Sequence, residues 1–158
     1  VCSSDLAATP AGRRQVAELP PGATAAESQA LLGETTELLA LDGLTEGGLS
    51  FQGVAELQHT VALCAKGGTA GGEALLEVAS TLAAARRLRR QIDDPALRPL
   101  TSALVADLRT LPELEQRLHF CLEEGGRVAN RASPPLEALR HDQRPAPPPA
   151  ASACPRGR

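Results

Sequence analysis

A run of arginines, Arg86-Arg87-Leu88-Arg89-Arg90, has the greatest potential for chemistry in this chain. On a helix, guanidinium groups at this spacing could contact nucleic-acid phosphates, and each neutralised charge would add salt-dependent affinity. We take Arg86, Arg87 and Arg90 as candidate nucleic-acid contacts because they fan out on the side opposite the apolar residues of that helix. Arginines paired with nearby Asp and Glu on a solvated face explain the run equally well.

The cysteine and histidine residues do not form a recognisable reactive site. Cys64 and Cys121 lack the close pairing of zinc ligands, and we expect both to be buried as small apolar side chains, as in a reducing compartment. His119 lies close to Cys121, but neighbouring helical positions point in different directions and no third group orients the ring. We therefore predict no catalytic, cofactor-binding or metal site.

The glycine-rich stretch 67–72 precedes a predicted helix, where anions are attracted to the N-terminus. A phosphate-binding loop would end in Gly-Lys followed by Ser or Thr. Here Lys66 stands before the glycines. The stretch is therefore expected to be a flexible turn between two helices.

Composition limits the classes to which the chain can belong. Its 158 residues and net charge of −3 suit one domain or one segment of a larger protein. With two Phe and no Trp, Tyr or Met, the core must consist of Leu, Ala and Val. No apolar run approaches the ~20 residues that span a bilayer, and the low aromatic content and near-neutral charge argue against a nucleic-acid-coating protein.

The two ends are expected to lie outside the fold. The opening Val1-Cys2-Ser3-Ser4-Asp5-Leu6 resembles the conceptual translation of a sequencing adapter, so residues 1–7 are predicted to be a non-native or disordered leader. Residues 142–158, which include Cys154, are rich in proline, which fixes φ and removes backbone donors. They are predicted to be a disordered or frameshifted tail, with a proline-rich ligand for a partner's aromatic groove as the alternative.

Residues 8–141 are predicted to be an all-α, irregular multi-helix bundle. Thr9-Pro10 provides an N-cap and a first helical residue, and Thr24 with Glu27 has the pattern of a capping box. Apolar residues at helical spacing and terminal residues predict further helices. These cover 24–43, 54–66, 73–92, about 100–108 and 113–123, with a last one that begins at Ser133-Pro134.

Several details of these helices bear on the core. Leu32 and Leu39 are expected to widen the apolar stripe of the second helix, and Phe51 is expected to insert into the core from a loop. Thr110 with Glu113 has the pattern of a second capping box. Leucines are expected to supply most helix contacts, because short helices need packing to persist.

Longer strings resemble the N-terminal part of endonuclease MutS2, the second bacterial MutS paralogue. The stretches 48–54 and Glu73 to Leu82 carry the resemblance most clearly, and Ala85 to Arg90, Leu111 to Glu115 and Gly126 to Pro134 follow in the same order and spacing. Together the strings cover about Thr9 to Arg140.

The resemblance implies the core, or lever, region of a MutS protein that lacks mismatch-recognition domains. In the full-length family it implies an ATPase that uses ATP and Mg²⁺, a long clamp, a nuclease domain and a homodimer. It also implies association with DNA or ribosomes, suppression of recombination and a cytoplasmic location. This segment is expected to couple ATPase to clamp, with the rest of its own chain as partner and no catalysis of its own. A free-standing helical adaptor whose apolar groove binds a partner helix is the alternative.

Overall fold

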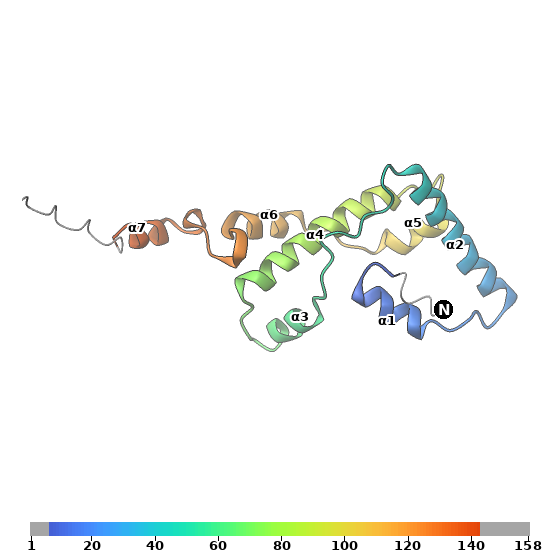
Figure 1. Ribbon diagram of the computed structural model, residues 1–158, viewed down its shortest axis with the longest axis horizontal. Helices are drawn as coiled ribbons and strands as arrows, with labels where there is room; N and C mark the ends of the chain where they lie inside the picture. The colour runs from blue at the N-terminus through green and yellow to red at the C-terminus, as the bar shows by residue number, and fades with distance from the viewer. Residues whose placement is uncertain (1–6, 143–158) are drawn as a thin grey trace, which may run out of the picture.

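The computed structural model describes residues 7–142 of the chain (Figure 1). The helices are α1 (Pro10–Glu18), α2 (Ala25–Leu44), α3 (Gln58–Ala65), α4 (Gly72–Ile92), α5 (Pro99–Ala106), α6 (Pro112–Cys121), the 3₁₀ turns η2 (Glu124–Gly126) and η3 (Asn130–Ala132), and α7 (Pro134–Asp142). The predictions for residues 1–6 and 143–158, with Cys2 and Cys154, lie outside the described residues. Asp142, predicted to begin the tail, instead ends α7.

The predicted all-α class is confirmed. Within residues 7–142 the chain forms no strand, only an isolated bridge between Leu122 and Val128. The molecule is elongated, with α4 in its middle, α6 beside α4, α2 near one end and α7 at the other (Figure 1). No helix in the described part is long and apolar enough to cross a membrane.

The first two helix starts have the predicted caps. The Gly12 N–H donates to Thr9 Oγ1 at 3.1 Å, and Pro10 is the first residue of α1. At α2 the Glu27 N–H donates to Thr24 Oγ1, and the Glu27 carboxylate accepts from the Thr24 N–H. Both caps satisfy backbone donors that a helix start leaves without partners.

The side of α2 that faces α5 is narrower than the predicted apolar stripe. Gly33, Glu37 and Leu41 recur every fourth residue on this side, and a Cβ on Gly33 would come within 2.7 Å of a Leu100 methyl group of α5. Leu41 is buried. Leu32 and Leu39 are each 67% exposed, so the prediction that they widen the packed stripe is wrong.

The segment before α3 is extended rather than helical. The Ala55 N–H donates to Thr81 Oγ1 at 3.0 Å, and that hydroxyl donates to the Gly53 carbonyl at 3.2 Å. These bonds hold the segment along α4, and α3 therefore begins at Gln58 instead of residue 54. Phe51 is 41% exposed, so its predicted insertion into the core is wrong.

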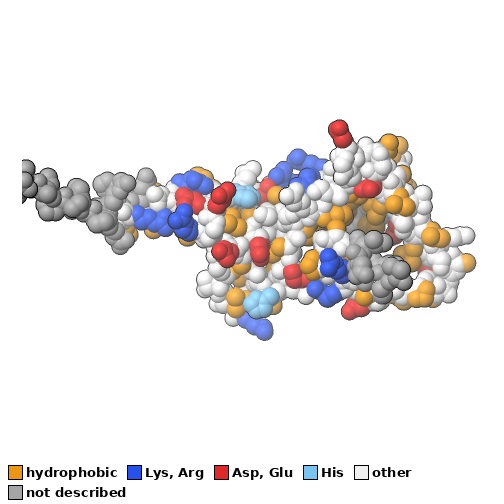
Figure 2. Space-filling view, in the orientation of Figure 1, with side chains coloured by type: hydrophobic (Ala, Val, Ile, Leu, Met, Phe, Trp, Pro, Cys, Tyr) orange, Lys and Arg blue, Asp and Glu red, His pale blue; other side chains and the backbone are white. Residues whose placement is uncertain are grey.

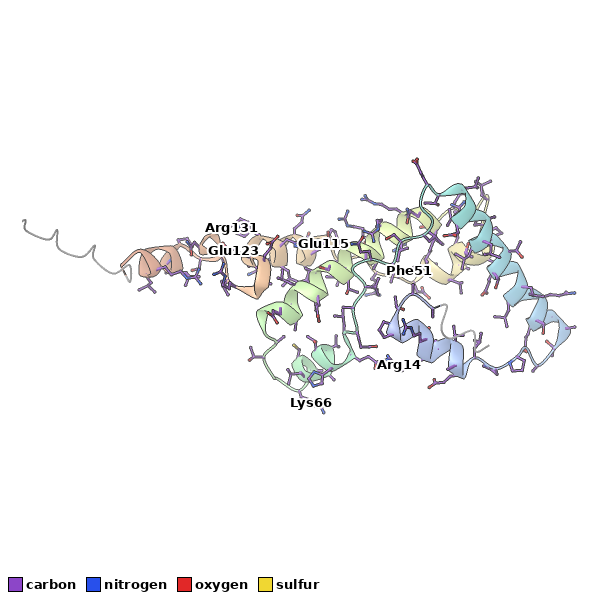
Figure 3. All side chains as sticks on the ribbon, in the orientation of Figure 1. Arg14, Phe51, Lys66, Glu115, Glu123 and Arg131 are labelled. Atoms are coloured by element: carbon purple, nitrogen blue, oxygen red, sulfur yellow. The ribbon has the colours of Figure 1, made fainter. Side chains whose placement is uncertain are left out.

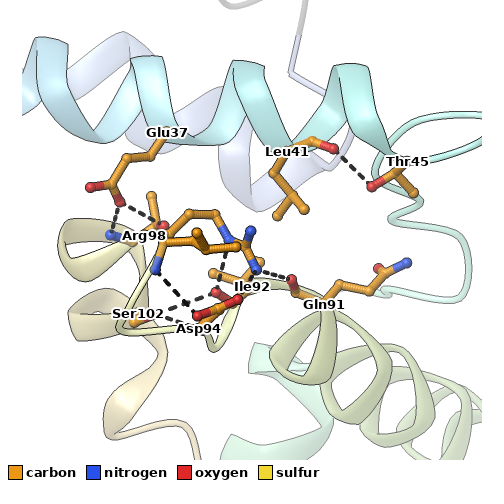
Figure 4. Close-up of polar contacts among 10 residues, drawn as sticks. Glu37, Leu41, Thr45, Gln91, Ile92, Asp94, Arg98 and Ser102 are labelled. Atoms are coloured by element: carbon orange, nitrogen blue, oxygen red, sulfur yellow. Dashed lines mark hydrogen bonds and ion pairs between the residues drawn. The ribbon is translucent and has the colours of Figure 1, made fainter.

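The buried side of α5 is polar rather than leucine-rich. Thr101 and Ser102 are buried, whereas Leu104 is 59% exposed. The Glu37 carboxylate of α2 accepts from the Thr101 N–H at 2.8 Å, the Thr101 hydroxyl at 2.9 Å and the Leu100 N–H at 3.3 Å (Figure 4). A side chain from another helix thereby caps the start of α5.

Hydrogen bonding lowers the pKa of the Glu37 carboxyl. Partial burial by itself raises the pKa of this carboxyl, but the hydrogen bonds from Thr101 and Leu100 outweigh that effect and hold the pKa below its ordinary value. On the far side of the α4–α5 turn, the Asp94 N–H donates to Ser102 Oγ at 2.8 Å (Figure 4). The turn and α5 are thus fixed by polar groups that hydrophobic periodicity does not reveal.

The predicted second capping box does not form. Leu111, not Thr110, is the N-cap of α6, and no side chain caps this helix start. Helix α6 ends at Cys121, two residues before its predicted end. Arg131 Nε donates to the Phe120 carbonyl at 2.7 Å, which secures η3 against the last turn of α6.

The buried apolar set of the described residues is small. It consists of Leu41, Ala79, Ala84, Leu88, Leu122 and Ala129. Many larger apolar side chains reach the surface, most densely over the half of the molecule that contains α2 and α5 (Figure 2). The expectation of buried cysteines is wrong, because Cys64 is exposed and Cys121 is half-buried.

The backbones of α4 and η2 meet at a pair of glycines. A Cβ on Gly72, in the first turn of α4, would lie 1.8 Å from the Gly126 carbonyl oxygen. A Cβ on Gly126 would lie 2.3 Å from the Glu73 nitrogen. The end of the glycine-rich stretch therefore permits close backbone packing as well as a turn.

We predict that Gly72→Ala destabilises the chain by about 1–3 kcal/mol, the usual cost of forcing extra volume into a tight contact. Gly43→Ala is the matched control, because a Cβ at Gly43 meets nothing within 4 Å. Since Gly43 lies inside α2, its replacement should stabilise by about 0.5–1 kcal/mol. Urea unfolding measures both, and equal effects would contradict the close approach.

Candidate nucleic-acid interface

Helix α4 arranges the arginine run on two of its sides. At about 100° per residue, Arg86, Arg89 and Arg90 lie on one side together with Asp93, whereas Arg87 points elsewhere. The sequence prediction grouped Arg87 with Arg86 and Arg90 and did not include Arg89. In the structure, the three arginines that share one side of α4 are Arg86, Arg89 and Arg90.

Arg86 binds a carboxylate of α6. Its Nε and Nη2 donate to the two oxygens of Glu115 at 3.0 and 2.7 Å, the two-pronged geometry that suits a guanidinium. Glu115 is only 7% exposed and lies where α6 meets α4 (Figure 3). Hydrogen bonding to Arg86 lowers the pKa of Glu115 despite burial, and the same bond raises the pKa of Arg86.

Arg87 fastens the extended segment before α3. Its Nη2 donates to the Ser50 carbonyl at 3.2 Å and to the Gln52 carbonyl at 2.9 Å. This side chain and Thr81 hold the segment along α4 from two points. Arg87 thus has a structural role within the chain, whether or not it also contacts nucleic acid.

Arg89 and Arg90 differ in how strongly the protein holds them. Arg89 Nη1 donates to the Leu108 carbonyl, and its Nε lies 3.7 Å from an Asp93 carboxylate oxygen. Arg90 is exposed. Within residues 7–142 it forms neither a side-chain hydrogen bond nor an ion pair. Arg87 is exposed too, but its guanidinium is held by two backbone carbonyls, so Arg90 is the arginine of the run that the described residues hold least.

A hollow of about 580 Å³ opens between α4 and α6. It is lined by Arg86, Arg89, Arg90, Asp93, Thr110, Pro112 and Gln116. Thr110, predicted from the sequence to cap α6, lines this hollow instead. The sequence prediction missed Arg89, Thr110 and Gln116. The three-residue helical spacing from Arg86 could have indicated Arg89, but the other two depend on how α6 packs.

The described residues contain no group of three or more His, Cys, Asp or Glu side chains placed to hold a metal ion. The basic hollow between α4 and α6 is the clearest candidate binding site in this part of the chain. Whether Arg86, Arg87 and Arg90 contact nucleic acid remains a prediction.

Comparison with known proteins identifies relatives over most of the chain. Endonuclease MutS2 of Synechocystis sp. is 40% identical over 137 residues, which cover 87% of this chain and 17% of the relative. Endonuclease MutS2 of Symbiobacterium thermophilum is 33% identical over 143 residues, 89% of this chain and 18% of the relative. Over this length the chain belongs to the endonuclease MutS2 family.

The same name belongs to a relative from Pelotomaculum thermopropionicum, 35% identical over 112 residues and 68% of this chain. No family model and no solved structure matches the chain. The chain spans less than a fifth of the length of these MutS2 relatives. The resemblance inferred from the sequence strings is confirmed.

The ion pair between Arg86 and Glu115 predicts a pH dependence of stability. Because the folded pKa of Glu115 lies below its ordinary value of 4.5, the pair stabilises the fold above that value. The contribution is lost as the pH falls from 4.5 through the lowered pKa. We predict that Glu115→Gln lowers stability at neutral pH and that its difference from wild type shrinks in acid.

Urea unfolding between neutral pH and about pH 3 measures this difference. Glu113→Gln is the control, because Glu113 is exposed on the same turn of α6 and should have a small effect. A Glu115→Gln deficit that is equally large at both ends of the pH range would contradict the assignment.

Proposed function

We propose that this chain is the helical lever segment of a MutS2-type protein, which joins an ATPase to a nucleic-acid clamp and performs no reaction itself. Similarity to endonuclease MutS2 supports the proposal. The structural observation that carries it is α4, a helix of 21 residues that is tied along its length to the segments around it. A lever must move as one piece, and such ties resist bending.

The ties are distributed along α4. Its first turn packs backbone to backbone against η2 through Gly72 and Gly126. In its middle, Thr81 bonds the segment that precedes α3. Near its end, Arg86 binds α6 and Arg89 binds the connection between α5 and α6. A displacement at one end of α4 would therefore be carried to several segments at once. This is the mechanical property that coupling requires.

The exposed apolar side chains fit a segment that packs against further parts of a longer protein. Leu44 is 82%, Leu97 71% and Leu104 59% exposed, and burial of each fully apolar side chain typically contributes about 1.5–3 kcal/mol. We propose the remainder of the MutS2 chain, including clamp and ATPase regions, as the partner that covers them.

The wider functions are proposed for the whole protein. They are ATP and Mg²⁺ binding, endonuclease activity, homodimer formation, suppression of recombination, action on DNA or ribosomes, and a cytoplasmic location. The endonuclease activity is supported by the relatives, which are endonucleases by name; the other functions follow from the family resemblance.

A chimera tests the lever. Residues 8–141 would replace the aligned segment of Synechocystis MutS2, and binding of branched DNA would be measured with and without ATP alongside ATP hydrolysis. We expect the chimera to keep the ATP-dependent change in affinity. Glu115→Arg should abolish that change by placing two cations together, with ATP hydrolysis retained, and the added exchange Arg86→Glu should restore it.

A folded Glu115→Arg chimera with an unaltered ATP-dependent change would contradict coupling through this segment. Circular dichroism of each chimera establishes that the helices are intact. Failure of the double exchange to restore coupling, when both chimeras fold, would also count against the proposal.

One observation favours the adaptor alternative. A hollow of about 460 Å³ beside α2 is lined by Thr35, Leu38, Leu39, Asp42, Leu49, Phe51 and Ile92. An apolar side chain of a partner helix would fit it. Full activity of a MutS2 relative from which the aligned segment has been deleted would favour the adaptor over the lever.

A further inference from the structure

We infer that the basic hollow between α4 and α6 is a phosphate-binding site formed by Arg86, Arg89 and Arg90. These arginines line a single cavity of about 580 Å³ from adjacent turns of α4. A phosphate group offers several acceptor oxygens, and guanidinium groups match its geometry. The assignment does not depend on the lever proposal, because a segment can bind phosphate whether or not it transmits movement.

The bonds that hold two of these arginines leave donors available. Arg86 uses Nε and Nη2 for Glu115, so both hydrogens of Nη1 remain. Arg89 uses Nη1 for the Leu108 carbonyl, which leaves Nη2. Because a guanidinium has five N–H donors, both can bind a second oxygen while the protein restrains their orientation.

Arg90 supplies the positive charge of the hollow that is in no ion pair with a carboxylate of the described residues. The lining residues include three arginines and one acid, Asp93, and Asp93 lies 3.7 Å from Arg89. Glu115 balances Arg86 from outside the hollow. One positive charge therefore remains after both acids are counted, and Arg90 is the arginine of the three that forms no ion pair within the described part of the chain, although its charge contributes to lowering the pKa of Glu115.

Thr110 and Pro112 extend the site to the start of α6. Both residues line this hollow and also an adjacent one of about 360 Å³ at the N-terminus of α6. No side chain caps α6. Its first residue, Pro112, has no N–H, so the backbone N–H groups that can favour an anion begin at Glu113, and the acids Glu113 and Glu115 of the first turn oppose that effect. Gln116 offers a further amide donor from the next turn.

The shared chemistry is a phosphate group, which a nucleic-acid backbone or a free nucleotide could supply. The full 158-residue chain would be titrated with inorganic phosphate at constant ionic strength, then with ATP, while NMR follows the arginine Nε–H resonances. Binding of a labelled short DNA duplex would be measured by fluorescence anisotropy over a range of salt concentrations. Arg90→Gln is the test variant and Arg117→Gln the control, because Arg117 is exposed on α6 and does not line the hollow.

We expect phosphate to shift the resonances of Arg86, Arg89 and Arg90, and Arg90→Gln to remove the effect. If the ligand is a nucleic-acid backbone, Arg90→Gln should reduce the slope of log affinity against log salt by about 0.9, the value for one phosphate contact, while Arg117→Gln leaves it unchanged. If the ligand is a free nucleotide, ATP should shift the same resonances and the duplex should bind all variants equally.

Either pattern supports the site. No phosphate-dependent shift at these arginines, or equal losses from Arg90→Gln and Arg117→Gln, would overturn it. Arg90 is exposed, so circular dichroism of Arg90→Gln should match wild type.

Discussion

The structure depends on the guanidinium groups of α4. Most of the chain's large apolar side chains stay partly exposed, and the described residues enclose only a small apolar set led by Leu41, Leu88 and Leu122. Burial of that size does not by itself fix the positions of short helices. Arg86 and Arg87 do so by direct bonds to α6 and to the extended segment, and the buried Glu115 is stable as an anion because Arg86 binds both of its oxygens.

Polar bonds between elements recur away from α4. Glu37 of α2 caps α5, and Arg98 Nη2 donates to the Gln91 carbonyl at 3.1 Å, which closes the turn between α4 and α5. Directional bonds of this kind restrict helix orientation more than non-directional apolar contact does. A fold assembled in this way suits a segment whose exposed leucines remain available for other parts of a MutS2 protein.

The sequence was sufficient for features that depend on local chemistry. Helix class, the caps at Thr9 and Thr24 and the end of α4 follow from neighbouring residues, and the family follows from ordered strings. Features that depend on packing were not predictable. Glu37 accepts hydrogen bonds from residues more than sixty positions away. Thr81 holds the segment before α3 along α4. Phe51 stays partly exposed because the surrounding elements do not cover it.

The candidate site also combines residues that the sequence predicted with an arrangement that depends on packing. The arginine run was evident, but its separation into Arg87 on one side and three arginines around a hollow depends on where α6 packs. Thr110 had the pattern of a cap, yet the N-cap of α6 lies one residue later, at Leu111. Patterns identify residue types suited to a task; neighbouring elements decide which of them act together.

Residue-resolved hydrogen exchange under native conditions tests most directly whether α4 is the rigid member of the fold. Amides of α4 and α6 should exchange only through global unfolding, whereas those of α1 and α3, which bury none of their residues, should exchange through local opening. Protection in α4 no greater than in α1 and α3 would contradict the account.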